Sequence, residues 1–396
     1  MMMKILNSKV FYIDTYSQKS SHEMFNASLL LMCAMIFEKV DCRIGSSSYQ
    51  NYLEIINHNP PKNINYKKIW VIEGNGRFTS FMRYLLSAIL NIRYLIFSQK
   101  DVILIFPFNN LFSLRLINFI NKFYKRNILI FCHGEMDEIL TNTRKGGFLH
   151  RILTKLSHNF FLNSKNKISQ GLYFSVLGDI LKENLGNILC NEKSIKFISI
   201  DHPYLFKSIE LHKRDNVKLK VGTVGVLNKI KGFYSFVEFV NKMNAKIRKS
   251  LDISVVGAIY EDATLLKDLN IELSSENNSL LDRDEFDYRI KQLDYILFFY
   301  PPESYRITAS GAIFDAICYE KPILALKNDY FEYVFEKFGS FGFLFEDINE
   351  MIYKIQGISG NELPCIDFEG IKNKLTPEAI CMQLKKELIN IGFIKV

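Results

Sequence analysis

The sequence predicts an α/β protein built from two doubly wound domains, each with a parallel sheet covered by helices on both faces. Short apolar runs alternate with longer amphipathic runs along the whole chain, as parallel strands require because their connections must cross over. The length of 396 residues is too great for one ordinary core and suits two. A polar stretch without periodicity, KSIELHKRDNVK at 207–218, interrupts the alternation in mid-chain. We therefore expect two domains that face each other across a cleft.

In the first half, short runs rich in β-branched and aromatic residues predict strands at 9–14, 69–73, 102–106, 128–132, 173–177 and 196–200. The amphipathic segments among them predict helices at 23–38, 78–97, 110–124, 148–157 and 178–186. In the second half the same rhythm predicts strands at 219–225, 252–257, 295–300 and 322–326. Helices are expected there at 232–247, 283–293, 311–319, 346–356 and 376–390.

These elements divide the chain into a first domain at 1–206, a linker at 207–218 and a second domain at 219–375. The remaining residues, 376–396, carry a helix that could cross back to brace the first domain.

Charge is distributed unevenly along the chain. Residues 1–215 hold 28 Lys and Arg against 16 Asp and Glu, a net charge of +12, whereas the remainder carries −4. Nucleic acid is not indicated as a partner, because the basic half contains no RNP-type motif and no helix-turn-helix pattern. An anionic membrane surface or a phosphorylated substrate fits the charge, and so does a basic composition without any partner.

Three features predict a cytoplasmic protein. The start, MMMKILNSKVFYIDTY, lacks the apolar stretch and cleavage site of a signal peptide. The sequence contains no uncharged segment long enough to span a bilayer, which takes about 18 residues or more. The seven cysteines form no CxxC pair and mostly lie within apolar runs, which is typical of core residues in a reducing compartment.

The segment SFMRYLLSAILNIRYLIF, residues 80–97, is apolar on almost every side and is interrupted by Arg83 and Arg93. Together with Arg77 it could form an interfacial helix, with its apolar side in lipid and its arginines at the headgroups. The favoured alternative is a helix packed between the sheet and a neighbour, with its arginines extending outward.

Ligands bind beyond the carboxyl ends of the strands in doubly wound sheets, so the loops that follow the strands are the places to search for a site. After the strand at 219–225 comes VLNKIKGF, in which Lys229 and Lys231 precede Gly232 and a helix. A helix opened by glycine and flanked by lysine suits a phosphate group, which needs N–H donors and positive charge. Surface lysines without a ligand are the alternative.

After the strand at 295–300 comes PPESYRITASG, and a helix can begin only at Ser310 and Gly311. The bare glycine leaves the first N–H groups open to a ligand, so this helix start and the one near Lys231 could bind one diphosphate together. Asp315 follows about a turn later and could accept hydrogen bonds from a ribose diol. The alternative for Asp315 is a solvent-facing carboxylate on a half-buried helix.

Three stretches resemble GT-B glycosyltransferases, in particular glycosyltransferase family 4 (group 1) of the bacterial surface-polysaccharide type. VGVLNKIKG (224–232) is similar to the family's VGRLxxxKG, FDAICYEKPIL (314–324) to its LEAMAxGxPVI, and ILIFCHGE (128–135) to a strand that ends in an active-site histidine. The resemblance implies two Rossmann-like domains with a nucleotide-sugar donor in the second. It also implies that Lys231 binds the diphosphate, that Asp315 holds the donor ribose and that His133 lines the active site.

The chain departs from the family pattern at three positions. Val226 stands where the family has arginine, Ile307 where it has the first glutamate of an E-x7-E pair, and Glu320 where it has glycine. Glu303 or Arg306 could stand in for the missing glutamate.

A neutral imidazole at His133 could bond a donor-sugar hydroxyl or act as a base on the acceptor. Glu135 is the alternative base, and a histidine that only bonds backbone at the sheet end is an equal alternative. The loop after the first strand offers Ser21 and His22 to the same site. His202, after the strand at 196–200, is expected to be structural.

No metal is expected. DRDEFD (282–287) is similar to a metal-binding motif, but Asp282 stands at a helix N-cap, where Asp is favoured. The resemblance implies the same, because GT-B enzymes as a class use helix dipoles and cations in place of a bound metal.

These observations favour a glycosyltransferase that moves a sugar from a nucleotide-diphosphate donor to a hydroxyl of a glycan acceptor, with no cofactor beyond the donor substrate. The basic, partly apolar first domain favours a polyprenyl-diphosphate-linked acceptor and peripheral association with the inner face of the membrane. The departures from the family pattern leave two alternatives open, a non-catalytic GT-B-like scaffold of a polysaccharide-assembly complex and a nucleotide-sugar epimerase.

Overall fold

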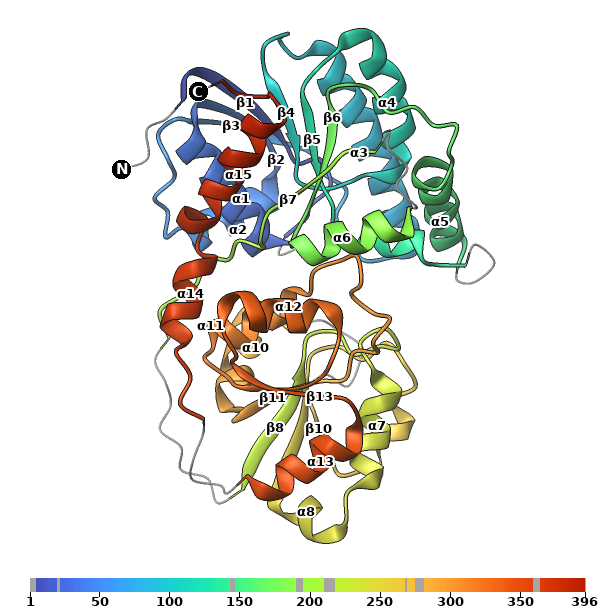
Figure 1. Cartoon of the computed structure of the whole chain (residues 1–396), viewed down its shortest axis with the longest axis vertical. Coiled ribbons are helices and arrows are strands. Elements are labelled where there is room, and N and C mark those ends of the chain that lie inside the picture. The colour runs from blue at the N-terminus through green and yellow to red at the C-terminus, as the bar shows by residue number, and fades with distance from the viewer. Residues whose placement is uncertain are drawn as a thin grey trace. The chain divides into compact units, whose positions relative to one another are not determined.

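The computed structural model describes residues 5–19, 22–142, 147–189, 195–209, 218–267, 269–274, 281–358 and 364–395. The chain forms two compact units (Figure 1). The first unit comprises Met1–Leu205, Ile307–Ala309 and Leu375–Val396, and the second comprises Phe206–Arg306 and Ser310–Lys374.

The first unit contains a seven-stranded parallel sheet of order β3-β2-β1-β4-β5-β6-β7. Its central strands β4 and β5 are buried along their whole length, as expected for strands covered on both faces. The strands are β1 (Ile5–Ile13), β2 (Phe37–Gly45), β3 (Ile64–Ile69), β4 (Ile103–Phe106), β5 (Ile128–Phe131), β6 (Leu172–Val176) and β7 (Phe197–Ser199).

Helices cover both faces of this sheet. Figure 1 shows α1, α2 and α15 on one side and α3, α4 and α5 on the other. They are α1 (Glu23–Ile36), α2 (Ser46–Ile55), α3 (Arg77–Phe97), α4 (Leu111–Tyr124), the 3-10 helix η1 (Gly134–Ile139), α5 (Phe148–Phe161), α6 (Asp179–Ile188) and α15 (Pro377–Asn390).

The C-terminal helix α15 is part of the first unit's core. Ile380, Leu384 and Leu388 are fully buried in the same cluster as the apolar side chains of α1. Gln383 fixes its direction, because its amide accepts from the backbone N–H of Asp201 at 2.9 Å and donates to the Asp201 carboxylate at 2.7 Å.

The second unit contains a six-stranded parallel sheet of order β10-β9-β8-β11-β12-β13. Its strands are β8 (Leu219–Val224), β9 (Leu251–Val256), β10 (Glu272–Leu273), β11 (Tyr295–Phe298), β12 (Ile323–Leu326) and β13 (Gly342–Phe345). Its helices are α7 (Phe233–Lys242), α8 (Ala245–Ser250), α9 (Thr264–Lys267), α10 (Arg283–Gln292), α11 (Gly311–Cys318), α12 (Asp329–Phe338), α13 (Ile348–Gly357) and α14 (Phe368–Leu375).

Both sheets reverse their strand order once. The reversal lies between β1 and β4 in the first unit and between β8 and β11 in the second. The crevice at the carboxyl ends of such a strand pair is where doubly wound sheets bind ligands. The fold therefore singles out the loops after β1 and β4, and those after β8 and β11.

The sequence predicted the fold class correctly and some elements wrongly. The strand expected at 69–73 is wrong: β3 ends at Ile69, and its alternation is hidden by the lysines of an edge strand. The helix expected at 23–38 ends at Ile36 and passes directly into β2. The helix expected at 232–247 is two helices, because the Asn244 side chain accepts from Ile247 N and caps a new start.

The long helix α3 combines features of both sequence-based interpretations. Arg83 is buried and donates to the carbonyls of Ile72 and Gly74, each at 2.9 Å, so the expected outward course is wrong for this arginine. Arg77 and Arg93 are exposed. None of the described helices is long and apolar enough to cross a membrane.

Candidate functional site

The loops that follow β8 and β11 are locked together in the second unit. Gly232 has a φ of +78°, and a Cβ at this position would lie 1.9 Å from the carbonyl oxygen of Phe299. No side chain fits there, so only glycine permits the approach. A second contact joins the two loops: Ser304 Oγ, after β11, donates to the carbonyl of Ile230, after β8, at 2.9 Å. The two loops therefore hold each other at the switch point of the sheet.

Lys231 lies on this locked turn. Its backbone N–H donates to Asn228 Oδ1 at 3.0 Å, and its ammonium group lies over Gly225, where a Cβ would be 3.9 Å from Nζ. No described carboxylate forms an ion pair with this ammonium group. The neighbouring Lys229 is exposed, and its backbone N–H donates to Glu261 Oε1 at 2.9 Å.

The start of α11 is open. Ser310 is buried with its hydroxyl 3.4 Å from the Tyr300 hydroxyl, and its side chain caps no helical N–H group. Gly311 is exposed, and a Cβ built on it would meet nothing within 4 Å. The first N–H groups of α11 are thus available to an anion, beside the loop that carries Lys231. Arg306, four residues before Ser310, is exposed.

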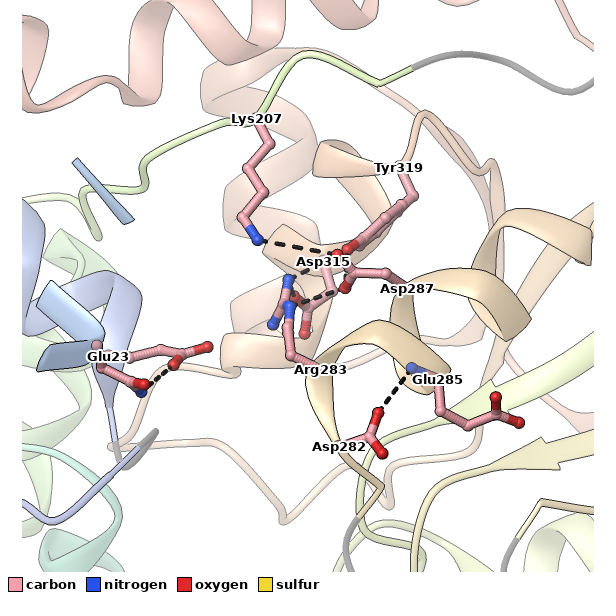
Figure 2. A network of polar contacts seen from close by, with 9 residues as sticks. Glu23, Lys207, Asp282, Arg283, Glu285, Asp287, Asp315 and Tyr319 are labelled. Atoms are coloured by element: carbon pink, nitrogen blue, oxygen red, sulfur yellow. Dashed lines mark hydrogen bonds and ion pairs between the residues drawn. The ribbon is translucent and has the colours of Figure 1, made fainter. Parts of the chain in front are cut away.

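Asp315 belongs to a polar network between α10 and α11. Figure 2 shows the side chains of Arg283, Asp287, Asp315 and Tyr319 pointing toward one another. Arg283 lies between the two carboxylates, with Nε 2.7 Å from Asp287 Oδ1 and Nη2 3.9 Å from Asp315 Oδ1. The Tyr319 hydroxyl donates to Asp287 and accepts from Arg283, and Lys207 lies 3.8 Å from Asp287.

His133 stands two residues after the end of β5 in the first unit, is itself buried, and packs against neighbouring rings. Its ring is 4.7 Å from that of His22, which begins α1 with a φ of +52°, and 4.5 Å from that of Phe25. His133 Nε2 lies 3.0 Å from the carbonyl of Pro107, so Nε2 donates and Nδ1 carries no proton. Burial lowers the pKa of His133 well below its ordinary value of 6.5, and His22 and His202 lower it further.

Glu135 faces the same cluster from η1. Its Oε1 accepts the backbone N–H of His133 at 2.9 Å, whereas Oε2 is buried without a hydrogen-bond partner among the described residues. Burial raises the pKa of Glu135 from 4.5 to about 8. The carboxyl group is therefore mostly protonated at neutral pH.

Asp137, on the same helix, binds the segment 307–309. The Thr308 hydroxyl lies 3.1 and 3.2 Å from the two oxygens of Asp137, whose pKa burial raises to about 6. Ile307, which stands where the family has glutamate, is 1% exposed. The position is thus an apolar anchor in the first unit.

The structure brings together most, but not all, of the residues singled out by sequence. One group lies on the segments that follow the neighbouring strands β8 and β11, namely Lys231, Ser310 and Gly311. A second group lies near the end of β5, namely His133, Glu135 and His22. Ser21 falls outside the described residues. Asp282 is an N-cap, as expected, because its side chain accepts from Glu285 N at 2.8 Å. Among the described residues, no three His, Cys, Asp or Glu side chains form a group that could hold a metal ion.

The sequence analysis did not single out two residues that lie near the candidate site residues, Arg283 and His202. Arg283 was not singled out, although a basic residue directly after an N-cap aspartate was visible in DRDEFD. His202 was expected to be structural; its Nδ1 lies 2.9 Å from the carbonyl of Pro203, yet its ring packs on Phe25, 5.4 Å away, beside His133. Only the fold reveals this, because 69 positions separate the two histidines in the chain.

Comparison with known proteins identifies the fold. No protein-family model matches the chain, and no curated protein matches its sequence. Among solved structures, the apo form of WaaB, a lipopolysaccharide outer core galactosyltransferase, shares 15% identity over 96% of this chain and 99% of that one, with a TM-score of 0.56.

Two further structures are similar over nearly the whole chain. HepE of Anabaena in complex with UDP-glucose has 12% identity, 97% coverage of each chain and a TM-score of 0.51. The N-terminal domain of Candida albicans trehalose-6-phosphate phosphatase has 9% identity, 98% coverage of each chain and a TM-score of 0.57. With its two parallel-sheet units, the chain has the GT-B fold.

The raised pKa of Glu135 predicts a pH-dependent contribution to stability. The pKa of Glu135 is about 8 in the folded protein and has its ordinary value of 4.5 in the unfolded chain. Its contribution to the free energy of unfolding is therefore complete below pH 4.5 and is lost as the pH rises to about 8. We expect the free energy of unfolding of the wild type, minus that of Glu135→Gln, to fall across this range with a slope approaching about 1.4 kcal/mol per pH unit. Denaturant titrations from pH 4.5 to 8.5 measure it. The histidines are present in both proteins and cancel in the difference. Parallel pH curves for the two proteins would show that Glu135 is ionised in the folded state.

Proposed function

We propose that the chain is a glycosyltransferase that moves a sugar from a nucleotide-diphosphate donor to a hydroxyl of a glycan acceptor in surface polysaccharide synthesis. The observation that carries the proposal is the locked pair of loops after β8 and β11. The Lys231 ammonium group and the open N-terminus of α11 lie on the segments that follow the adjacent strands β8 and β11. Positive charge and free N–H groups at one crevice are what a diphosphate requires.

In this proposal the donor's diphosphate lies across the two loops and Asp315 accepts hydrogen bonds from its ribose. The leaving nucleoside diphosphate gains negative charge as the sugar departs. Lys231 and the α11 dipole are fixed before that charge develops, so they stabilise the transition state more than the ground state. Lys229 and Arg306, which are exposed near the same loops, would add positive charge at the rim.

Similar proteins support this assignment. WaaB is described as a galactosyltransferase, and HepE was solved with UDP-glucose bound. We therefore take a uridine nucleotide sugar as the first donor to examine.

His133 is proposed to accept a hydrogen bond at Nδ1 from a sugar or acceptor hydroxyl. The Pro107 carbonyl holds the proton on Nε2, and the lowered pKa keeps the ring neutral. Glu135 is then a positioning residue, because it accepts the His133 backbone N–H and is itself protonated at neutral pH.

We propose a lipid-linked acceptor, of the polyprenyl-diphosphate type, and peripheral binding to an anionic membrane surface. Helices α3, α4 and α5 contain no Asp or Glu in their 21, 14 and 14 residues. Exposed large apolar side chains lie on all three, namely Phe78, Ile89, Phe97, Leu116, Phe119, Phe123 and Phe148. A basic face with exposed aromatic rings suits the headgroup region of an anionic bilayer.

The second candidate function is a non-catalytic GT-B-like scaffold. Buried Ile307 favours it, since no carboxylate can act at that position. Val226 also lacks the charge of the family arginine. A nucleotide-sugar epimerase is the third candidate. Product analysis with donor alone would reveal an epimerised sugar.

Binding of nucleoside diphosphates tests the donor site. Calorimetry with the nucleoside diphosphates UDP and GDP, and with the monophosphate CMP for comparison, should show binding of at least one diphosphate. Lys231→Ala should weaken that binding by about 1.5–3 kcal/mol, the usual worth of a charge-assisted hydrogen bond. Lys249→Ala is the matched control, because this exposed lysine lies in the last turn of α8, which leads into the amino end of β9. Absence of binding to the whole panel would favour the scaffold, and equal effects of the two substitutions would remove Lys231 from the site.

Turnover tests the role of His133. With a donor that binds, His133→Ala should lower turnover by about 100-fold or more, in the range of general base catalysis, while the donor dissociation constant changes much less. Glu135→Gln retains the carbonyl oxygen that accepts the His133 N–H and should keep most of the activity. Survival of turnover in His133→Ala together with its loss in Glu135→Gln would exchange the two roles.

Vesicle co-sedimentation tests the membrane proposal. Each Lys or Arg near an anionic surface contributes about 1 kcal/mol, and salt weakens this contribution. We expect the protein to pellet with anionic vesicles at low ionic strength, less at high ionic strength, and hardly at all with neutral vesicles. A protein that remains in the supernatant with anionic vesicles at low salt would favour a soluble acceptor.

A further inference from the structure

A cavity of about 620 Å³ opens on the first unit between the starts of α3 and α5. Its walls are almost entirely apolar, formed chiefly by Phe78, Phe81, Phe148, Leu149 and Leu153. The volume lies within the range of small-molecule sites, about 300–1,000 Å³. Phe78 and Phe148 are nonetheless 74% and 69% exposed, so two large rings at the mouth remain in water unless something covers them.

The charged groups at the mouth indicate an anionic occupant. Arg77 lines the cavity and is exposed. Helices α3 and α5 both begin here, after Gly76 and Gly147, and neither N-cap residue provides a side-chain hydrogen bond. The mouth therefore combines a guanidinium group with the positive ends of two helices, and the two helices contain no carboxylate.

The cavity and His133 are supported by the same short helix, η1. Glu138 of η1 accepts from His150 Nδ1 at 2.8 Å and from the Thr154 hydroxyl, so it fastens α5 to η1. The same 3-10 helix begins directly after His133 and carries Glu135. One short element thus supports both the cavity wall and the proposed reaction centre within one unit.

We propose that this cavity binds the hydrocarbon chain of a single phosphate-bearing lipid, with Arg77 and the two helix starts at its headgroup. The inference rests on the proposed function in one respect: the lipid is the carrier of the glycan acceptor. Chain binding removes the exposed faces of Phe78 and Phe148 from water, and the headgroup stays at the charged mouth.

Farnesyl phosphate, used below its aggregation threshold, is the probe, with inorganic phosphate and farnesol as comparisons. We expect farnesyl phosphate to bind at least tenfold more tightly than either. Phe78→Ser and Phe148→Ser should each weaken it at least tenfold, and Arg77→Ala should weaken farnesyl phosphate but not farnesol. Trp70→Ser is the matched control: Trp70 is 73% exposed directly after β3 and does not line the cavity, so its loss should change the affinity less than twofold.

Three results would overturn the inference. The first is farnesyl phosphate binding no more tightly than inorganic phosphate, and the second is an equal loss in Phe148→Ser and Trp70→Ser. The third is self-association that Phe148→Ser abolishes without any lipid binding, which would assign the cavity to a second copy of the chain. The assay contains no nucleotide. Failure here therefore leaves the donor proposal standing, and failure of nucleotide binding leaves the cavity assignment standing.

Discussion

The contact between Gly232 and the carbonyl oxygen of Phe299 is the constraint on which the candidate donor site depends. A Cβ at Gly232 would lie 1.9 Å from that oxygen, so the turn after β8 can rest on the end of β11 only if this residue has no side chain. Because the turn rests there, Ser304 reaches the Ile230 carbonyl. Lys231 is held on the loop after β8, and β8 is the neighbour of β11, whose following segment leads to α11. Charge and free N–H groups are then fixed before any ligand arrives, which reduces the entropy lost on binding.

In the first unit, burial keeps the candidate site residues His133 and Glu135 mostly uncharged. His133 and Glu135 lie too deep to ionise easily: burial lowers the pKa of the imidazole and raises that of the carboxyl group to about 8. The cluster is therefore neutral at physiological pH, and its polarity resides in oriented hydrogen bonds to the Pro107 carbonyl and the His133 N–H. A neutral, positioned acceptor at Nδ1 suits a hydroxyl of a sugar or an acceptor better than it suits a phosphate. The two units therefore differ in chemistry: positive charge and free N–H groups lie after β8 and β11 in the second unit, and neutral hydrogen-bonding groups lie after β5 in the first.

The sequence was most informative where a local rule applied. The alternation of apolar runs gave the two parallel sheets, and glycine beside lysine indicated the turn at Gly232, because both signals are short-range. It was least informative where side chains meet across the fold. The pairing of Arg283 with Asp315, the packing of His202 near His133 and the bond from Thr308 to Asp137 join residues far apart in the chain, and no periodicity encodes them. The sequence analysis also misplaced the edge strand β3, since the lysines that protect it obscure its alternation.

The central claim is that a nucleoside diphosphate binds across the loop after β8 and the first turn of α11. Hydrogen–deuterium exchange with and without saturating UDP tests it without any substitution. The account predicts slower exchange of the amides in 225–233, because the ligand covers this loop, and in 311–313, because its phosphates accept the first N–H groups of α11. Little change is expected around α8, which leads into the amino end of β9. Binding of UDP with unchanged exchange in both segments would contradict it.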